Sequence, residues 1–274
     1  MKEGFDMLKN LKIVEIELFN YCNRTCSWCP NKYIDRRNKF EALDFHLFIN
    51  LLQQLKDIDY KGVFSFSRYN EPFAENDLLH SACEIIKQVF PENKLVSNTN
   101  GDYLTKEILD NCLIDELTIM DYDCKGKDWC YERLQSWGFN EIIEYEKFLV
   151  SHKGNLTVLY YFNWPLVNCI NNRGGNLEEF TPKERRTSPC FEPLYFIGIN
   201  YDGTVSPCCN IRNDCKNREL IMGSLKENTL QELWDKKENK FLRNCVSTSY
   251  FPIYCAYCEN TGGRYTTRLG QLDY

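Results

Sequence analysis

The sequence from residue 22 to residue 29 reads Cys22-Asn23-Arg24-Thr25-Cys26-Ser27-Trp28-Cys29, which places three thiols at C-x3-C-x2-C spacing. It follows Leu11 to Leu18, where apolar and polar residues alternate as they do in a half-buried β-strand. The three thiols are therefore predicted to lie on the loop after the first strand. Their number is informative, because a structural zinc site uses four ligands, whereas an iron–sulfur cluster held by three thiolates keeps one iron open.

The overall composition favours metal binding over disulfides. The 274 residues include 15 cysteines and only three histidines. A disulfide framework would need a secreted chain, but Met1 to Met7 has acidic residues and no apolar signal segment, and no apolar run is long enough to cross a membrane. We therefore expect a soluble, cytoplasmic protein with no membrane partner. The net charge of −6, from 33 Lys and Arg against 39 Asp and Glu, argues against nucleic acid as a partner.

Strands and helices are predicted to alternate over roughly the first 165 residues. Asp44, then Asn76 or Asp77, and then Thr105 are candidate N-caps of three successive helices. Repeated βα units predict a parallel sheet, open or closed into a barrel, with functional residues at the carboxyl ends of its strands. After the first strand, β-rich runs recur at residues 63–66, 94–96, 117–119 and 156–162.

The pattern changes after Gly174-Gly175, so a domain boundary is predicted near residue 180. Tyr201-Asp202-Gly203 lies between two short β-rich runs, and an Asp-Gly pair in this position is typical of a β-hairpin. Residues 225–242 then read as helix with a break near Asp235.

A second group of four cysteines follows this boundary: Cys190, Cys208, Cys255 and Cys258. Four thiols suit a zinc tetrathiolate or a 4Fe–4S cluster equally well, and their spacing does not separate the two. Eight other cysteines are not assigned as ligands, namely Cys83, Cys112, Cys124, Cys130, Cys169, Cys209, Cys215 and Cys245. Cys83 and Cys112 lie in predicted helical segments, where a buried structural thiol is the default expectation.

The triad Cys22, Cys26 and Cys29, with the aromatic Trp28 before its third cysteine, resembles the signature of the radical S-adenosylmethionine enzymes. The resemblance implies that the three thiolates hold a 4Fe–4S cluster whose open iron chelates S-adenosylmethionine, and that Trp28 packs near the adenine. It also implies a 5'-deoxyadenosyl radical that removes a hydrogen atom from a bound substrate, and a flavodoxin- or ferredoxin-type protein as electron donor.

Two further segments resemble motifs with which this family binds S-adenosylmethionine. Tyr69-Asn70-Glu71-Pro72 stands after the second strand, where the family holds the methionine amino group, although only Glu71 and Pro72 match. Asn98-Thr99-Asn100-Gly101 stands after the third strand and resembles the polar strand end that meets the ribose. The cofactor-binding residues implied are Trp28, Asn70, Glu71, Thr99 and Asn100.

The second cysteine group, with C-x12-G-x4-C spacing from Cys190 through Gly203 to Cys208 and then C-x2-C, resembles the shortened "twitch" form of the family's SPASM domain. Residues 259–274 contain no cysteine, which argues against a third cluster. The resemblance implies two 4Fe–4S clusters and an α/β fold. We expect a partial (β/α)6 barrel of the radical SAM type over residues 1–180. A small twitch domain, a β-hairpin plus helix holding the auxiliary cluster, is expected over 181–274.

Asn172-Arg173-Gly174-Gly175 extends the resemblance to members of the family that oxidise an alcohol on a polar ring. Tyr69 and Arg173 match the substrate pocket of such enzymes, whereas Asn98 and Asn210 replace a Tyr and a Glu. The implied function is an oxidoreductase of antibiotic or carbohydrate biosynthesis. It would oxidise a secondary alcohol of a small aminocyclitol, sugar or similar molecule to a ketone, with the auxiliary cluster accepting the second electron.

Three alternatives stay open at this point. Cys209 directly follows a predicted ligand and could return a hydrogen atom to a substrate radical, which would make the protein an epimerase. A peptide substrate is the second alternative, but only 21 residues precede Cys22, and many peptide-modifying relatives carry an N-terminal leader-binding domain. The third is a zinc-binding scaffold without enzymatic activity.

Overall fold

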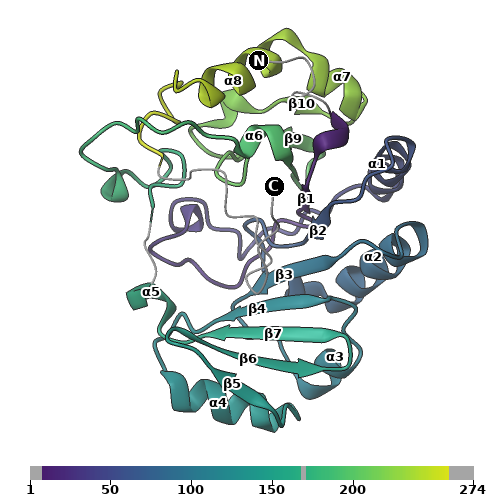
Figure 1. Ribbon diagram of the computed structural model, residues 1–274, viewed down its shortest axis with the longest axis vertical. Coiled ribbons are helices and arrows are strands. Elements are labelled where there is room, and N and C mark those ends of the chain that lie inside the picture. The colour runs from purple at the N-terminus through teal and green to yellow at the C-terminus, as the bar shows by residue number, and fades with distance from the viewer. Residues whose placement is uncertain (1–7, 168–170, 259–274) are drawn as a thin grey trace.

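The strands form one ten-stranded sheet in the order β10-β9-β8-β1-β2-β3-β4-β7-β6-β5 in the computed structural model, which describes residues 8–167 and 171–258 (Figure 1). Six neighbours, from β8 through β1 to β7, run parallel, and both edges of the sheet are antiparallel. The strands are β1 Ile13–Ile16, β2 Val63–Ser65, β3 Leu95–Thr99, β4 Glu116–Met120, β5 Ile142–Glu144, β6 Phe148–Lys153, β7 Leu156–Tyr161, β8 Phe196–Ile199, β9 Thr204–Ser206 and β10 Gly223–Ser224.

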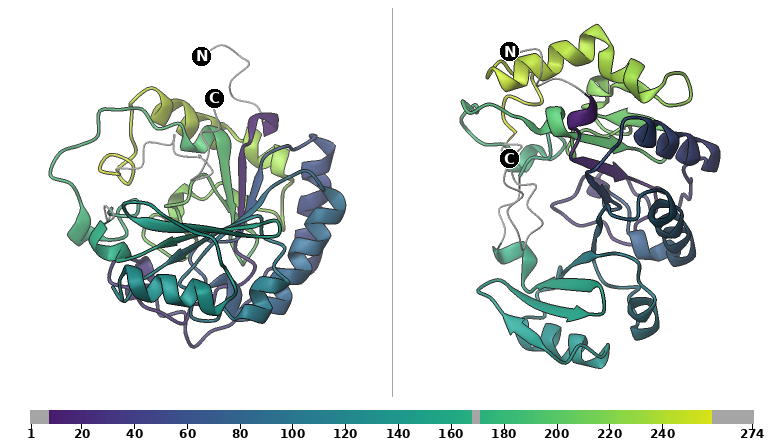
Figure 2. Two further views of the ribbon diagram at one scale, coloured as in Figure 1. Left: turned by 60° about the horizontal axis from the view of Figure 1, so that its bottom comes forward. Right: turned by 45° about the vertical axis from the view of Figure 1, so that its right-hand side comes forward.

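Helices cover the outer face of the curved sheet and its two ends. Helices α1, α2 and α3 connect the successive parallel strands from β1 to β4, and α1 and α2 lie along the outside in Figure 2. At the ends of the sheet, α7 and α8 lie beside β9 and β10, and α4 lies beside β5 and β6 (Figure 1). The helices are α1 Phe45–Asp57, α2 Asn76–Val89, α3 Lys106–Asp110, α4 Lys127–Ser136, α5 Trp164–Val167, α6 Glu192–Tyr195, α7 Leu230–Asp235 and α8 Lys237–Ser247.

Two of the three predicted helix caps are confirmed. The Asp44 side chain accepts hydrogen bonds from the first backbone N–H groups of α1, and the Thr105 side chain does the same for α3. The prediction that Asn76 or Asp77 caps α2 is wrong. A 3-10 helix, Pro72–Glu75, runs directly into α2, so no residue at this junction has the extended conformation that a capping side chain needs.

Apolar and charged side chains alternate along β1, so one face of the strand contacts the hydrophobic core and the other faces the inside of the curved sheet. Val14 and Ile16 are fully buried and belong to the main hydrophobic core, together with Leu51 of α1. Glu15 and Glu17 project to the opposite side, because successive side chains of a strand point to opposite faces. Both are nevertheless buried, with 8% and 1% of their surface exposed, so the inner face of the sheet holds charged groups that other chain segments cover.

The region after residue 180 continues the same sheet. Strand β8 pairs in parallel with β1, and the predicted hairpin follows, with Gly203 at φ 85° in the turn between β8 and β9. The helical region is broken at Lys236 between α7 and α8, as predicted near Asp235. The division of the chain at residue 180 stays a prediction.

The hairpin of β5 and β6 and the helix α4 were not predicted from the sequence. Helix α4 has a weak apolar stripe, because Trp129 and Tyr131 are partly exposed and the buried positions are few. Among the described residues, no helix is both long enough and apolar enough to cross a membrane.

Candidate active site

The three triad cysteines lie on the loop between β1 and α1, as predicted. Cys22, Cys26 and Cys29 are partly buried free thiols, and the Cys29 N–H donates to the Cys26 carbonyl in a tight turn. Burial raises the pKa of Cys22 to about 12 and that of Cys26 to about 11. A metal centre bound here would therefore have to displace these protons, as metal binding to thiols generally does.

Arg24 anchors the triad loop to the ends of two other strands. Its guanidinium contacts Asp102, after β3, at 2.6 Å and Asp123, after β4, at 2.8 Å. The Asn23 side chain also donates to Asp102, at 2.7 Å, and the Asn100 side chain donates to Asn23, at 2.8 Å. The Asn100-Gly101-Asp102 segment is thus in direct contact with the cysteine loop, which sequence spacing alone did not predict.

Glu71 joins the ends of β2 and β3 beneath this loop. One carboxylate oxygen accepts from the Thr99 hydroxyl at 2.5 Å, and the other accepts from the Asn100 backbone N–H at 2.9 Å. Burial raises the pKa of Glu71 to about 7. Next to it, the buried Oδ1 atom of Asn70 has no hydrogen-bond partner among the described residues. An unpaired buried acceptor is costly, so this position fits a ligand that brings a donor, such as an ammonium group.

Aromatic rings line the same side of the site. Trp28 packs on Tyr122 with the ring centroids 5.6 Å apart, and Tyr122 packs on Trp164 at 6.4 Å. The pKa of the Tyr122 hydroxyl is raised by burial and by the nearby thiols of Cys26 and Cys29. Sequence reasoning missed Tyr122. Its position two residues after a parallel strand was the available signal, because such strand ends converge on the site.

Arg173 is close enough to Cys29 of the triad and to Cys209 for both thiols to influence its pKa. The backbone is left-handed at three successive residues, with φ of 49° at Arg173, 63° at Gly174 and 82° at Gly175, which explains the glycine pair. The Asn217 side chain donates to the Gly174 carbonyl at 3.0 Å and holds this loop. Arg173 is partly buried, and its guanidinium is close enough to Tyr69 and Cys209 to lower the pKa values of both groups.

Two contacts hold the Tyr69 side chain in place, one at its hydroxyl and one at a face of its ring. Its hydroxyl donates to the Cys209 carbonyl at 2.9 Å, and the Arg212 guanidinium lies 4.3 Å from the ring centroid. Tyr69, Arg173 and Cys209 are therefore neighbours, although up to 140 positions separate them in the chain.

Asn98 and Asn210, the two asparagines predicted to line the substrate pocket, form no hydrogen bond with Tyr69 among the described contacts. The Asn98 side chain donates to the Ser67 hydroxyl at 2.9 Å. The Asn210 side chain donates to the Sγ atom of Cys258 at 3.4 Å, so it contacts the second cysteine group, and its buried Oδ1 atom has no partner among the described residues.

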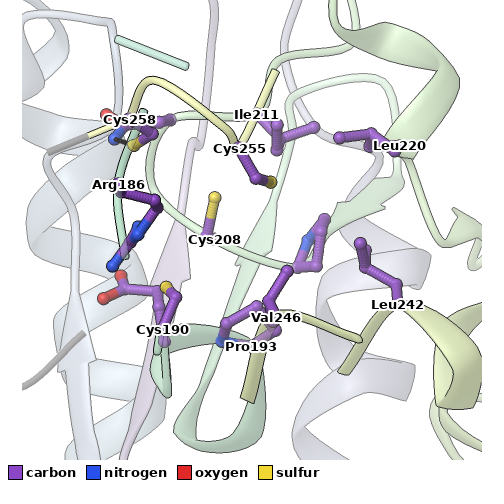
Figure 3. Close-up of a pocket in the computed structure, with 13 residues that line it drawn as sticks. Arg186, Cys190, Pro193, Cys208, Ile211, Leu220, Leu242, Val246, Cys255 and Cys258 are labelled. Atoms are coloured by element: carbon purple, nitrogen blue, oxygen red, sulfur yellow. Dashed lines mark hydrogen bonds between the residues drawn. The ribbon is translucent and has the colours of Figure 1, made fainter. Parts of the chain in front are cut away.

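The second group of cysteines surrounds one cavity (Figure 3). Cys190, Cys208, Cys255 and Cys258 all line it, with Arg186 and Glu192 also in its wall. Burial raises the pKa of Cys190 to about 11 and that of Cys255 to about 12. In the described part of the chain, no three potential ligands converge on a point where one metal ion would bind.

A buried ionic network that was not predicted connects the loops of the two cysteine groups. Arg36 contacts Glu17 at 2.6 Å and Asp214 at 2.8 Å, and Arg212 contacts Asp214 at 2.7 Å. The Arg212 guanidinium also donates to the Asn31 side chain, two residues after Cys29. The network joins the triad loop to the loop after Cys208. Of the unassigned cysteines, Cys83 is buried in α2, as predicted, and Cys130 is buried in α4. The prediction for Cys112 is wrong, because α3 ends at Asp110 and this thiol is only partly buried. Cys169 lies outside the described residues.

Comparisons with known proteins agree with this architecture. A family described as the SPASM iron–sulfur cluster-binding domain matches residues 190–259. The chain is 26% identical over 256 residues to the S-adenosyl-L-methionine-dependent 2-deoxy-scyllo-inosamine dehydrogenase of Niallia circulans, covering 93% of this chain and 95% of that protein.

Two solved structures share the fold. The crystal structure of BtrN in complex with AdoMet and 2-DOIA superposes with a TM-score of 0.71 at 24% identity, over 93% of this chain and 94% of that chain. The structure of anSMEcpe with bound AdoMet gives 0.53 at 10% identity, over 88% and 81%. The predicted fold class is confirmed.

Proposed function

The chain is a radical S-adenosylmethionine enzyme with a SPASM-type iron–sulfur domain, and on this premise we propose that it oxidises a secondary alcohol of a small polar molecule to a ketone. The observation that carries the proposal is the position of Arg173. Arg173 is partly buried, and it is close enough to Cys29 of the triad and to Tyr69 and Cys209 for all three groups to influence its pKa. A substrate oxygen bound to Arg173 would lie between a hydrogen-abstracting site and an electron-accepting one.

The residues around the triad fit a cofactor with an amino group and an adenine. Cys22, Cys26 and Cys29 would hold the first cluster, and Asn70 offers its unpaired Oδ1 atom to the methionine amino group. Glu71, Thr99 and Asn100 form the floor of this site, and Trp28 provides a ring for the adenine. When bound, the cluster and S-adenosylmethionine supply the radical that abstracts hydrogen, and the auxiliary cluster supplies an electron acceptor.

The chain's own contribution is to position the substrate and to exclude water. Arg173 carries a fixed fork of donors that suits hydroxyl or carboxylate oxygens. Tyr69, 8% exposed, closes the site against the loop of Cys209. Cys190, Cys208, Cys255 and Cys258 would hold the auxiliary 4Fe–4S cluster, and the Asn210 amide donates to one of these thiols. An aminocyclitol or a sugar fits these donors, and a flavodoxin- or ferredoxin-type protein is the proposed reductant.

Turnover with a candidate alcohol deuterated at the carbinol carbon tests the proposal. Deuterium should appear in 5'-deoxyadenosine, with one equivalent formed per ketone. Anaerobically purified protein should carry about eight iron and eight sulfide per chain for two 4Fe–4S clusters. Stoichiometric zinc without sulfide would establish the scaffold alternative instead, and deuterium in neither product nor cofactor would reject alcohol oxidation.

Epimerisation is a second candidate because of the position of Cys209. Burial raises the pKa of its thiol well above the ordinary value, so the sulfur keeps its hydrogen close to Arg173. Replacing Cys209 with Ala should then stop inversion of the substrate while 5'-deoxyadenosine continues to form. Full inversion by this variant would dismiss the role. A modified peptide, in place of a small molecule, would show as a mass change in a peptide and not as a ketone.

A further inference from the structure

The Asn210 side chain is in contact with one of the four cysteines of the auxiliary cavity. It is 1% exposed, forms part of the cavity wall and comes two residues after Cys208. Its amide nitrogen donates to the Sγ atom of Cys258 at 3.4 Å, whereas its buried Oδ1 atom has no hydrogen-bond partner among the described residues. The amide therefore directs an N–H dipole at a sulfur that we assign as a cluster ligand.

The loop that carries Arg173 holds Asn210 in this position. The Asn210 carbonyl accepts from the Asn217 side chain at 2.9 Å and from the Asn176 side chain at 3.3 Å. Gly174 packs so closely that an added Cβ atom would lie 3.3 Å from both the Cβ atom and the carbonyl oxygen of Asn210. Because the backbone is fixed from this side, the amide is already oriented toward Cys258 by protein contacts alone.

A donor in this place favours the reduced form of an iron–sulfur cluster. Reduction adds negative charge to the cluster and its ligand sulfurs, and hydrogen bonds become stronger as the acceptor becomes more charged. Hydrogen bonds to the sulfurs are accordingly one of the factors that set the reduction potential of such clusters. Arg186 and Glu192 also line the cavity and carry opposite charges, and both stay unchanged in the variants compared below.

We propose that Asn210 is a positioning residue whose amide raises the reduction potential of the iron–sulfur cluster held by Cys190, Cys208, Cys255 and Cys258. This role differs from the substrate contact that the sequence predicted for Asn210. Its consequence for turnover rests on the proposed alcohol oxidation. There the substrate radical loses one electron to this cluster and its hydroxyl proton to water as the C=O bond forms, so a higher potential favours the ketone.

Redox titration of the holoenzyme, followed by electron paramagnetic resonance, tests the inference. Asn210→Leu keeps the size of the side chain without its donor, and Asn210→Ala removes both. Each should lower the equilibrium constant for reducing the auxiliary cluster about tenfold, which is about 59 mV for a one-electron couple. The iron content should stay at that of the wild type. A Cys29→Ala version of each protein identifies which signal belongs to the auxiliary cluster.

Asn239 provides a matched control in the same region. It is a buried asparagine of α8, and its amide donates to the carbonyls of Met222 and Leu233 at 3.0 Å and 2.7 Å. Asn239→Ala should lower stability and leave the potential unchanged. In product assays, Asn210→Leu should lower kcat with KM unchanged, and 5'-deoxyadenosine should form in excess over ketone because hydrogen abstraction continues.

An auxiliary potential equal to that of the wild type in both Asn210 variants, with full iron content, overturns the inference. A raised KM at unchanged potential would return Asn210 to the substrate pocket. If both variants lose iron, Gly174→Ala decides, because it crowds the Asn210 amide and leaves its donor present: a lowered potential supports the inference and an unchanged one rejects it. Absence of ketone from the wild type with every alcohol tested means that the proposed function has failed, and the potentials still decide the role of Asn210.

Discussion

The two cysteine sites are built in opposite ways. The triad comes from eight consecutive residues on one loop and is partly exposed, and Arg24 within this loop is held by Asp102 and Asp123 from two other segments. The auxiliary site draws Cys190, Cys208 and the pair Cys255 and Cys258 from three separate segments around one cavity.

The difference matters for both stability and chemistry. A local loop can keep its shape with one side open, as a site that admits a cofactor must. The auxiliary site shares its residues with a small second hydrophobic core, in which Cys190 packs with Leu242 and Val246. So few apolar residues provide little stability, and a metal cluster that ties the three segments together would contribute much of the rest.

The largest effect should follow loss of a triad thiol. Cys29→Ala should abolish both S-adenosylmethionine cleavage and ketone formation, and iron should fall from about eight to about four per chain because the auxiliary cluster stays. Iron analysis and product assays measure this. Cys124→Ala, a change at an exposed cysteine without an assigned role, should keep the full iron content. Complete loss of iron in Cys29→Ala would contradict the independence of the two sites.

Loss of an auxiliary thiol should separate the two halves of the reaction. Cys255→Ala should still cleave S-adenosylmethionine, while ketone formation is lost and residues 181–258 become sensitive to limited proteolysis, because the segments are no longer tied together. Cys245→Ala, a buried cysteine of α8 outside the cavity, is the control and should keep its iron. Protease resistance equal to that of the wild type in Cys255→Ala would show that the cluster does not stabilise this region.

A smaller effect should follow loss of the anchor on the triad loop. Arg24→Met removes contacts with Asp102 and Asp123 at a partly exposed position, which is worth about 1 kcal/mol, or roughly fivefold weaker binding of S-adenosylmethionine. Equilibrium binding to the reconstituted protein measures it. The exposed Arg37, paired with Asp35, offers a control, and Arg37→Met should bind normally. A similar loss in both variants would mean that Arg24 does not specifically position the loop.

The last prediction is a pH dependence of stability at the floor of the open site. Burial raises the pKa of Glu71 from 4.5 to about 7, so the folded state holds this proton more tightly than the unfolded state. Its contribution to stability is present below pH 4.5 and is lost as the pH rises through about 7. The free energy of unfolding of metal-free Glu71→Gln, measured with denaturant, should therefore decrease less than that of the wild type as the pH rises through this range. The exposed Glu75→Gln variant should follow the wild type.

Some features of the fold and the site were predictable because they depend on neighbours in the chain. The helix caps at Asp44 and Thr105 and the turn at Gly203 are each set by a few consecutive residues. The cysteine spacings and the glycine pair after Arg173 are local in the same way. The edge hairpin of β5 and β6 was missed, because its strands are stabilised by cross-strand pairing at the end of the sheet and not by a strong local pattern.

The sequence by itself determined which residues could bind clusters and where along the chain the strands and turns would fall, since spacing and side-chain chemistry are local properties. Only the tertiary structure decided which of these residues meet. It placed Asn210 against Cys258, Tyr122 against Trp28, and Glu15 against Arg68. Such contacts depend on parallel pairing of strands whose partners lie as far as 183 positions apart and on burial of charges between them, and neither is encoded in a short stretch of residues.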